Sequence, residues 1–284
     1  MKRADLFPGQ GSQFPGMAKD LYDASHDVRD AFNVSKAILG FDIAPILFEG
    51  TAEDLKQTRV TQPGIFLHSI AASWTMGGDA PAAVAGHSLG EFSALCAARA
   101  IDFREALTLV RVRAEAMQAA CENEPSTMAA VLGGSIQDIE AVCEAIDEVV
   151  VPANYNAPGQ LVISGSTAGI EAATERLKDV DGMKRVLPLP VGGAFHSPLM
   201  QPAAADLKAQ IERTTFRTPR CPVYQNVTAR PTTDAGEIAR NLEAQLTGPV
   251  RWMQTIRAMD ADGITDYREV GPGKVLTGLN RKIL

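Results

Sequence analysis

Apolar positions recur along the chain in blocks joined by glycine-rich turns, and their spacing predicts strands and helices in alternation. A short apolar run at residues 4–7 precedes the loop PGQGSQFPG (8–16), and a helical pattern follows over residues 19–39. The run PAAVAG (81–86) passes through a tight turn into the helical stretch GEFSALCAARA, and a further long helix is predicted over 103–121. A strand, a glycine-rich turn and a helix in succession are typical of an α/β unit.

The central part of the chain predicts shorter elements in a different order. Strands are expected at MAAVLGG, EVVVPANY, QLVISGS and KRVLPLPV, and helices at SIQDIEAVCEAI and TAGIEAATERLKDV. This βαββαβ order is that of the split βαβ, or ferredoxin-like, unit. We therefore expect an α/β protein whose large domain, residues 1–127 and 192–284, carries an inserted small subdomain at residues 128–191. Beyond the insertion, ITDYREVGPGKVLTGLNRKIL predicts a strand, a turn and a final helix.

The composition is that of a globular protein with a surplus of acidic residues. Of 284 residues, 45% are hydrophobic and 21% are charged, which is enough apolar material to bury a sizeable core and excludes disorder over most of the length. Lys and Arg total 27 against 34 Asp and Glu, which gives a formal net charge of -7. Because nucleic-acid-binding proteins normally carry a basic surplus or a Lys/Arg run, we expect no nucleic-acid partner.

Neither a membrane segment nor cysteine chemistry is indicated. The longest apolar stretches are far too short to span a bilayer, and MKRADLF lacks the apolar region of a signal peptide, so a cytoplasmic protein without membrane contact is expected. The four cysteines, Cys96, Cys121, Cys143 and Cys221, are widely spaced and form no CxxC or Cys/His cluster. We therefore expect neither a disulfide scaffold nor a metal site.

The pentapeptide GHSLG (86–90) fits the pattern G-x-S-x-G between a predicted strand and a predicted helix, which is the context this motif requires. Small residues at Gly86 and Gly90 allow a sharp bend that directs the Ser88 hydroxyl outward at the start of the helix. There the backbone N–H of Leu89 and the helix dipole favour an oxyanion. The alternative is a serine that only caps the helix, and the surrounding elements favour a nucleophile.

A nucleophilic serine needs a base, and the chain has four histidines. His26 lies in a charged helical stretch and is expected in solvent, and His68 lies in the apolar run IFLHSIAASW and is expected in the core. His87 adjoins Ser88, so its side chain is expected to point away from the hydroxyl. His196, in the turn GAFHSPLM after the inserted unit, is the best candidate base.

The third member of a catalytic triad is harder to find. A hydrolase order of serine, acid and histidine would place an Asp or Glu between residues 88 and 196. The acids there fall mostly on polar helix faces or within the inserted unit. Either the acid cannot be recognised from the sequence pattern, or another group such as a backbone carbonyl orients His196.

One arginine of the helix predicted over 104–121 falls on an apolar face when the helix is projected at about 100° per residue. Arg111 shares its face with charged residues, whereas Arg113 lies among Ala106, Leu109, Met117 and Ala120. A guanidinium in an apolar sector needs an anionic partner. A structural ion pair, a side chain that extends to the surface, and a substrate carboxylate held by the planar fork all remain open.

The N-terminal loop does not match a dinucleotide-binding pattern. Gly9, Gly11 and Gly16 lack the G-x-G-x-x-G spacing, and no acid stands about 20 residues on to bind a ribose. The N–H groups of this loop can still donate to an oxyanion from the side opposite Ser88, or the loop is a plain tight turn.

Six motifs together closely resemble the malonyl-CoA:acyl carrier protein transacylases of fatty acid synthesis, and the related polyketide acyltransferases share most of them. They are FPGQGSQ (7–13), GHSLGE (86–91), Arg113 in LVRVRAEAMQ, GAFHS (193–197), QNVTARP (225–231) and EVGPGKVLTGL (269–279). The resemblance covers residues 6–283. It implies an α/β-hydrolase-like large domain with a ferredoxin-like subdomain, and transfer of a malonyl group from coenzyme A to the phosphopantetheine thiol of acyl carrier protein through a serine ester.

The resemblance also assigns roles to matching positions. It implies that Ser88 is the nucleophile and that His196 is first the base and then the acid. Arg113 would bind the free malonyl carboxylate, and the backbone N–H groups of Gln10 and Leu89 would form the oxyanion hole.

Two further positions and the partners follow from the same resemblance. The main-chain carbonyl of Gln245 would orient the histidine, which would account for the missing acid. Phe195 matches a position that accompanies malonyl rather than methylmalonyl preference in the polyketide relatives, although such a pocket discriminates by only about 1–3 kcal/mol per methylene. The implied partners are malonyl-CoA and acyl carrier protein, with no metal or cofactor beyond the coenzyme A thioester, and a monomer is expected.

Three other functions fit parts of the pattern. A serine thioesterase or esterase would use the same nucleophile, but an HGGG-type oxyanion motif and a strand-end acid before the histidine are missing. A non-catalytic module that docks carrier proteins would not need Ser88, His196 and Arg113 together. A trans-acting malonyl loader of a polyketide synthase shares the same motifs, so the acceptor carrier protein stays open.

The acidic surplus raises a question about binding, because coenzyme A and acyl carrier protein are themselves anionic. Positive charge must then be collected locally. The candidates are Lys184 and Arg185 on the inserted unit, with Lys274, Arg281 and Lys282 near the C-terminus, and ordinary solvated surface is the alternative for each of them.

Overall fold

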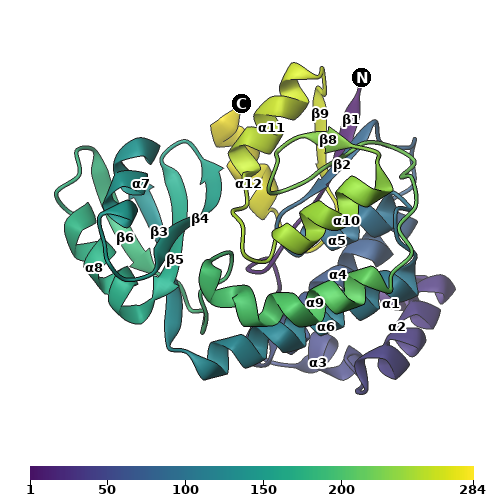
Figure 1. Cartoon of the computed structure of the whole chain (residues 1–284). Coiled ribbons are helices and arrows are strands. Elements are labelled where there is room, and N and C mark those ends of the chain that lie inside the picture. The colour runs from purple at the N-terminus through teal and green to yellow at the C-terminus, as the bar shows by residue number, and fades with distance from the viewer.

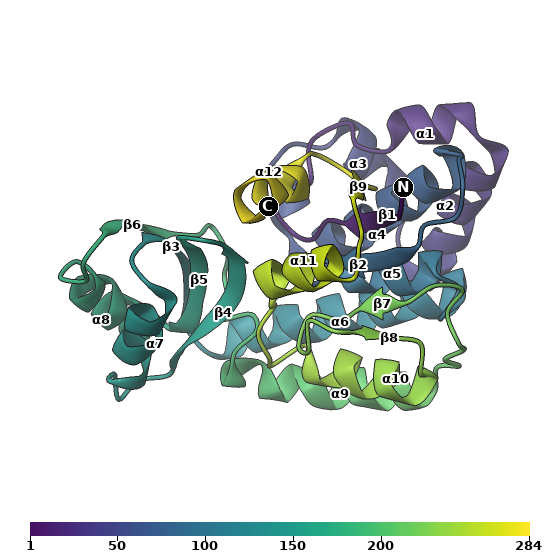
Figure 2. The same ribbon diagram turned by 90° about the horizontal axis from the view of Figure 1, so that it is seen from above.

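A computed structural model describes the backbone of residues 1–284 and every side chain except that of residue 123. The chain is a mixed α/β protein with two separate sheets, which lie in adjacent parts of the molecule (Figures 1 and 2). The predicted α/β class is confirmed by these sheets and the helices around them. Among the residues described, no helix is both long and apolar enough to span a membrane.

Five strands form the first sheet, in the order β8-β7-β2-β1-β9. Their bounds are β1 (Arg3–Phe7), β2 (Ala83–Gly86), β7 (Val223–Tyr224), β8 (Pro231–Thr232) and β9 (Asp266–Glu269). Strands β1, β2, β7 and β9 pair in parallel, and β8 runs antiparallel to β7. Phe7 is in register with Gly86, so the carboxyl ends of β1 and β2 lie side by side.

Helices cover both faces of this sheet (Figure 2). They are α1 (Lys19–Ala24), α2 (His26–Leu39), α3 (Ala44–Glu49), α4 (Thr58–Thr75), α5 (Gly90–Ala97), α6 (Phe103–Asn123), α9 (Gln201–Glu212), α10 (Ala235–Ala244), α11 (Trp252–Ala261) and α12 (Val275–Ile283), with the 3-10 turns η1 (Asp54–Lys56) and η2 (Pro198–Met200). The side chains of β1 and β2 alternate between the two cores that result. Phe7 and Val84 pack into the larger core with α2, α4, α5 and α6, while Leu6 and Ala85 pack into a core that contains Trp252 of α11.

The helical pattern over residues 19–39 forms two helices rather than the single one predicted. Ser25 is extended (φ -130°, ψ 130°), so it ends α1 and caps α2, and its hydroxyl accepts a hydrogen bond from the Val28 N–H at 3.4 Å. Serine often lies at the start of a helix, because its hydroxyl can accept a hydrogen bond from a backbone N–H that has no partner in the first turn. The short elements α3 and β8 were not predicted, and neither were α10 and α11, although both of these helices carry apolar residues at helical spacing.

The second sheet has four antiparallel strands in the order β4-β5-β3-β6. Its elements are β3 (Ser126–Gly133), α7 (Ile136–Glu144), β4 (Val150–Ala157), β5 (Gln160–Ser166), α8 (Thr167–Leu177) and β6 (Met183–Pro188). The predicted βαββαβ order is confirmed, and we refer to residues 126–188 as the small unit. The small unit has its own core, and β4 packs against α11 and α12 (Figure 2).

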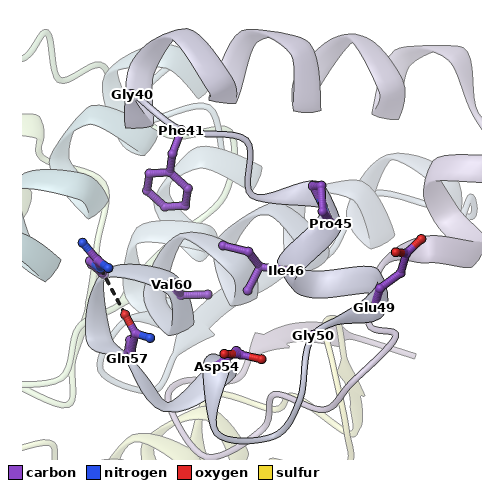
Figure 3. A pocket seen from close by; sticks show the side chains of 10 residues that line it. Gly40, Phe41, Pro45, Ile46, Glu49, Gly50, Asp54, Gln57 and Val60 are labelled. Atoms are coloured by element: carbon purple, nitrogen blue, oxygen red, sulfur yellow. Dashed lines mark hydrogen bonds between the residues drawn. The ribbon is translucent and has the colours of Figure 1, made fainter.

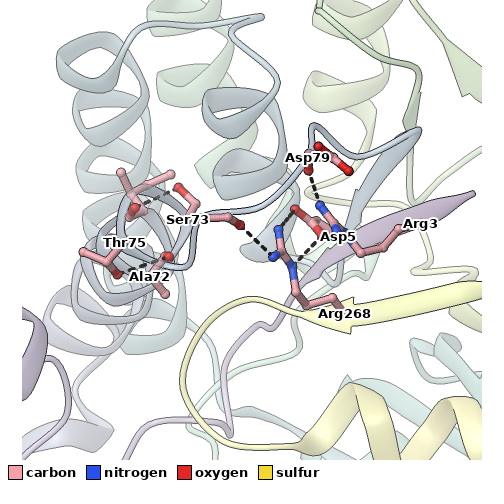
Figure 4. Close-up of polar contacts among 9 residues, drawn as sticks. Arg3, Asp5, Ala72, Ser73, Thr75, Asp79 and Arg268 are labelled. Atoms are coloured by element: carbon pink, nitrogen blue, oxygen red, sulfur yellow. Dashed lines mark hydrogen bonds and ion pairs between the residues drawn. The ribbon is translucent and has the colours of Figure 1, made fainter.

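An ion-pair cluster ties the amino-terminal part of the first sheet together (Figure 4). Asp5 on β1 is in register with Arg268 on β9, and the guanidinium donates to both carboxylate oxygens at 2.9 and 2.7 Å. Arg3 also donates to Asp5, at 3.2 Å, and to the carbonyl of Asp79. Bidentate pairing of this kind helps to fix the relative position of neighbouring strands. The cluster lies on the side of β1 away from its carboxyl end, which adjoins the turn at Ser88.

Candidate active site

Ser88 lies on a strained turn between β2 and α5. Its backbone is left-handed, with φ 52°, which is uncommon for a residue with a side chain. A Cβ at Gly86 would overlap the backbone of Gly90, and a Cβ at Gly90 would overlap the carbonyl of Phe7. Both glycines are therefore required by close backbone approach, as the G-x-S-x-G pattern predicts.

The structure brings Ser88 and His196 together from positions 108 residues apart, with 2.7 Å between Ser88 Oγ and His196 Nε2. The other ring nitrogen, Nδ1, lies 2.9 Å from the carbonyl oxygen of Gln245 and 3.1 Å from that of Gly248. Carbonyl oxygens only accept, so Nδ1 carries the proton and Nε2 faces the hydroxyl as an acceptor. Backbone carbonyls thus occupy the position of the acid that the sequence did not reveal.

The electrostatic surroundings keep His196 neutral. Burial and the nearby charge of Arg113 lower the pKa of His196 from 6.5 to about 3. The imidazole is therefore unprotonated at neutral pH, which is the state that a general base needs.

Arg113 is buried beside the two residues, with 1% of its surface exposed. Its guanidinium donates to Gln62 Oε1 at 2.8 Å, to Ser88 Oγ at 3.1 Å and to Gln245 Oε1 at 3.3 Å. Among the described residues, no carboxylate forms an ion pair with Arg113, and its Nε has no hydrogen-bond partner. The surface-directed alternative is wrong, because the guanidinium is buried and faces the serine. Burial lowers the pKa of Arg113 to about 10, so it remains charged at neutral pH. The buried Glu91 carboxylate lies beyond ion-pair distance, but its charge still acts on Arg113 and opposes this lowering of the pKa.

Arg111, two positions earlier, lies at the surface and pairs with Glu115 at 3.1 Å, as the helix projection predicts.

The two N–H groups predicted to form an oxyanion hole lie beside the turn. Gln10 follows β1 in a loop that packs against the turn: the His87 N–H donates to the Phe7 carbonyl at 2.9 Å, and a Cβ at Gly9 would overlap the His87 carbonyl. Neither the Gln10 N–H nor the Leu89 N–H donates to another group in the part of the chain that the structure describes.

The other histidines lie apart from the hydroxyl. His87 Nε2 is 2.8 Å from Asn156 Oδ1 of the small unit, and the ring is 5.6 Å from that of Trp252. His26 is exposed, as predicted, and lies 3.1 Å from Asp30. His68 is half-buried rather than fully in the core, its Nδ1 has no hydrogen-bond partner among the described residues, and burial lowers its pKa to about 4.

A buried polar network behind Ser88 was not predicted from the sequence. Glu91 is fully buried and accepts from the Asn226 N–H at 2.8 Å and from Gln225 Nε2 at 3.0 Å. Asn226 in turn accepts the Ser88 N–H at 2.7 Å and donates to the Gly86 carbonyl at 2.6 Å. Burial raises the pKa of Glu91 to about 7. Glu91 is a single acidic residue in the otherwise apolar helix GEFSALCA, and this sequence feature could have indicated the buried network.

A cavity of about 410 Å³ adjoins the site and is lined by Gln10, Phe195 and Cys121, among others. Phe195 is 7% exposed. A second cavity, of about 740 Å³, shares Asp54 and Gln57 with the first but opens between α2, α3 and α4, away from Ser88 and His196 (Figure 3).

The candidate docking cations Lys184, Arg185, Lys274, Arg281 and Lys282 are all exposed. All four cysteines are free thiols, and no cluster of potential metal ligands occurs among the described residues.

Comparison with known proteins gives this geometry its context. Residues 6–278 match the family model described as the acyl transferase domain. The malonyl CoA-acyl carrier protein transacylase of Bacillus subtilis is 42% identical over 99% of this chain and 90% of its own length, and that of Escherichia coli is 42% identical over 99% and 92%. The chain belongs to this family.

Solved structures agree with that assignment. An acyl carrier protein S-malonyltransferase from Vibrio cholerae superposes with a TM-score of 0.94 at 41% identity, covering 100% of this chain and 94% of that one. A malonyl-transacylase solved in complex with a type II polyketide synthase acyl-carrier protein superposes with a TM-score of 0.95 at 39% identity, covering 100% and 93%. The predicted membership of the malonyl-CoA:acyl carrier protein transacylase family is confirmed.

Proposed function

We propose that this protein transfers a malonyl group from malonyl-CoA to the phosphopantetheine thiol of acyl carrier protein, in fatty acid biosynthesis, through a malonyl ester on Ser88. One observation carries the proposal: the Ser88 hydroxyl lies 2.7 Å from a neutral histidine and 3.1 Å from a buried guanidinium. A nucleophile, a base and a cation suited to a carboxylate converge on one point.

In the first half of the reaction, Ser88 Oγ attacks the thioester carbonyl while His196 Nε2 takes its proton. The N–H groups of Gln10 and Leu89 stabilise the oxyanion of the tetrahedral intermediate. The C–S bond then breaks, and His196 returns the proton to the sulfur, so coenzyme A leaves as a thiol. In the second half, His196 takes the proton of the carrier thiol, the sulfur attacks the ester, and Ser88 recovers the proton.

Arg113 supports selection of the malonyl group. Its Nε lacks a partner and its Nη2 hydrogen bond to Ser88 Oγ is replaceable, so a malonyl carboxylate would gain charge-assisted bonds there. An acyl group without a carboxylate would leave a buried cation underpaired. Phe195 would limit the room for an α-methyl group.

The finer architecture belongs to the same proposal. An α/β-hydrolase-like domain (1–127 and 192–284) would carry a ferredoxin-like subdomain (128–191), and the antiparallel order β4-β5-β3-β6 supports the latter. The protein would act as a cytoplasmic monomer, without nucleic-acid or membrane partners and without a metal or cofactor beyond the coenzyme A thioester.

A second candidate acceptor has a specific observation in its favour. A malonyl-transacylase with a TM-score of 0.95 was solved with a type II polyketide synthase acyl-carrier protein. Acceptor carrier proteins from a fatty acid and a polyketide system, compared by kcat/KM, would distinguish the two roles.

The test of the transfer itself is intact-mass analysis after brief exposure to malonyl-CoA. The native protein should gain one malonyl group, and Ser88→Ala should gain none. Addition of carrier protein should then yield malonyl-carrier protein rather than free malonate, which separates a transferase from a thioesterase. An adduct that persists in Ser88→Ala would refute the assignment of the nucleophile.

A further inference from the structure

The peptide bond between Ser88 and Leu89 is fixed by a side chain from a distant part of the chain. The Ser88 carbonyl accepts the Glu91 N–H at 3.0 Å and Gln245 Nε2 at 2.9 Å, so both of its lone pairs are used. The peptide is trans, and in a trans peptide the N–H points away from the carbonyl in the same plane. The bond from Gln245 therefore also sets the direction of the Leu89 N–H.

This support acts on a strained residue. Ser88 has a left-handed backbone, which a residue with a side chain keeps only where its surroundings impose it. On the amino-terminal side, the Ser88 N–H is held by Asn226 Oδ1 at 2.7 Å. Side-chain amides thus hold both peptide groups that flank the serine.

The orientation of the Gln245 amide is determined by its neighbours. Arg113 can only donate, so the atom that faces its Nη2 at 3.3 Å must be the amide oxygen. That places Nε2 toward the Ser88 carbonyl. Gln245 is buried, with 1% of its surface exposed, so water does not replace either bond.

We propose that the side-chain amide of Gln245 is a positioning residue for the oxyanion hole. By holding the Ser88 carbonyl, Nε2 keeps the Leu89 N–H directed at the place where the oxyanion forms, and it polarises the same peptide so that the N–H is a stronger donor. This role is separate from that of the Gln245 main-chain carbonyl, which accepts from His196 Nδ1 at 2.9 Å. The inference rests on the proposed acyl transfer at Ser88.

Gln245→Leu tests the role, because it removes the amide and leaves the main-chain carbonyl in place. We expect the single-turnover acylation rate to fall about 10- to 100-fold with malonyl-CoA and with acetyl-CoA alike, because every thioester needs the oxyanion hole. The pH dependence of the rate should not change, since His196 keeps its carbonyl partners.

Gln62→Leu is the matched comparison. Gln62 accepts from the same guanidinium, at 2.8 Å, but among the hydrogen bonds of the described residues it makes none to the Ser88–Leu89 peptide. Its loss should lower the rate with malonyl-CoA more than the rate with acetyl-CoA. Gln245→Glu is a second variant of similar size. Its carboxylate, ionised beside Arg113, still accepts from the guanidinium but cannot donate to the Ser88 carbonyl, so it should lose rate on acetyl-CoA as Gln245→Leu does.

Three results would overturn the inference. One is an acetyl-CoA rate within about twofold of the native rate in either Gln245 variant. Another is a loss confined to malonyl-CoA, which would place the effect on Arg113, and the third is a shifted pH profile, which would place it on His196. Failure of the native protein to form any acyl-Ser88 would instead refute the proposed function.

Discussion

Replacing Arg113 with alanine should cost malonyl transfer far more than acetyl transfer. A carboxylate held by two charge-assisted bonds gains about 3–6 kcal/mol in total. Before the substrate binds, Arg113 already donates hydrogen bonds of 3.1 and 3.3 Å to Ser88 and Gln245. Exchanging these bonds for bonds to the carboxylate lowers the net gain in binding free energy to about 2–3 kcal/mol. At about 1.4 kcal/mol per tenfold change, Arg113→Ala should lower kcat/KM for malonyl-CoA roughly 30- to 150-fold.

The assay is the rate of acyl-Ser88 formation from malonyl-CoA and from acetyl-CoA, followed by mass spectrometry under single-turnover conditions. Arg111→Ala is the control, because that arginine is on the same helix but forms only an exposed pair with Glu115, worth at most about 1 kcal/mol to stability and nothing to the site. Equal losses of malonyl and acetyl transfer in Arg113→Ala would refute carboxylate binding and assign Arg113 to the hydroxyl of Ser88 alone.

Three further predictions concern pH, packing and docking. The pKa of His196 is lowered to about 3, so the base stays unprotonated and the acylation rate should hold as pH falls from about 8 to about 5; a fall with an apparent pKa near 6.5 would contradict this. In Gly193→Ala the new methyl group would overlap Cys121 Sγ, the end of a side chain that can rotate away. The unfolding free energy should therefore fall by no more than about 1 kcal/mol in denaturant titration. Cys121→Ala in the same chain should restore much of this loss, and two additive losses would refute the clash. Reversing Lys184 and Arg185 to Glu should raise KM for carrier protein at low salt and not at high salt, and an unchanged KM would exclude them from the docking surface.

Local pattern predicted most of the elements that frame the site. The βαββαβ order of the small unit and the strand, turn and helix around GHSLG follow from apolar spacing and glycine placement, which act over a few residues. Ser25 shows the limit: it lies within a continuous helical pattern, yet its side chain caps a second helix. The helices α10 and α11 were not predicted, although their apolar residues recur at helical spacing, as Ile238 and Leu242 on α10 and Ile256 and Met259 on α11 show.

The site residues divide in the same way. Helical periodicity placed Arg113 on an apolar face, and the structure buries it there. No periodicity connects Glu91 to Gln225 and Asn226, more than 130 positions later, so the network that holds Ser88 from behind was not visible.

By itself, the sequence determined the chemistry: a serine on a glycine-flanked turn, a histidine in a distant loop, and an arginine on the wrong face of its helix. These are properties of single residues and their near neighbours, which short-range sterics and periodicity control. The tertiary structure alone decided how they work together. It set 2.7 Å between Ser88 and His196, and it placed the Gln245 carbonyl, which only the family resemblance had implied, 2.9 Å from His196 Nδ1. Hydrogen bonds depend on atomic distances and directions, and folding fixes these only when segments far apart in the chain pack against one another.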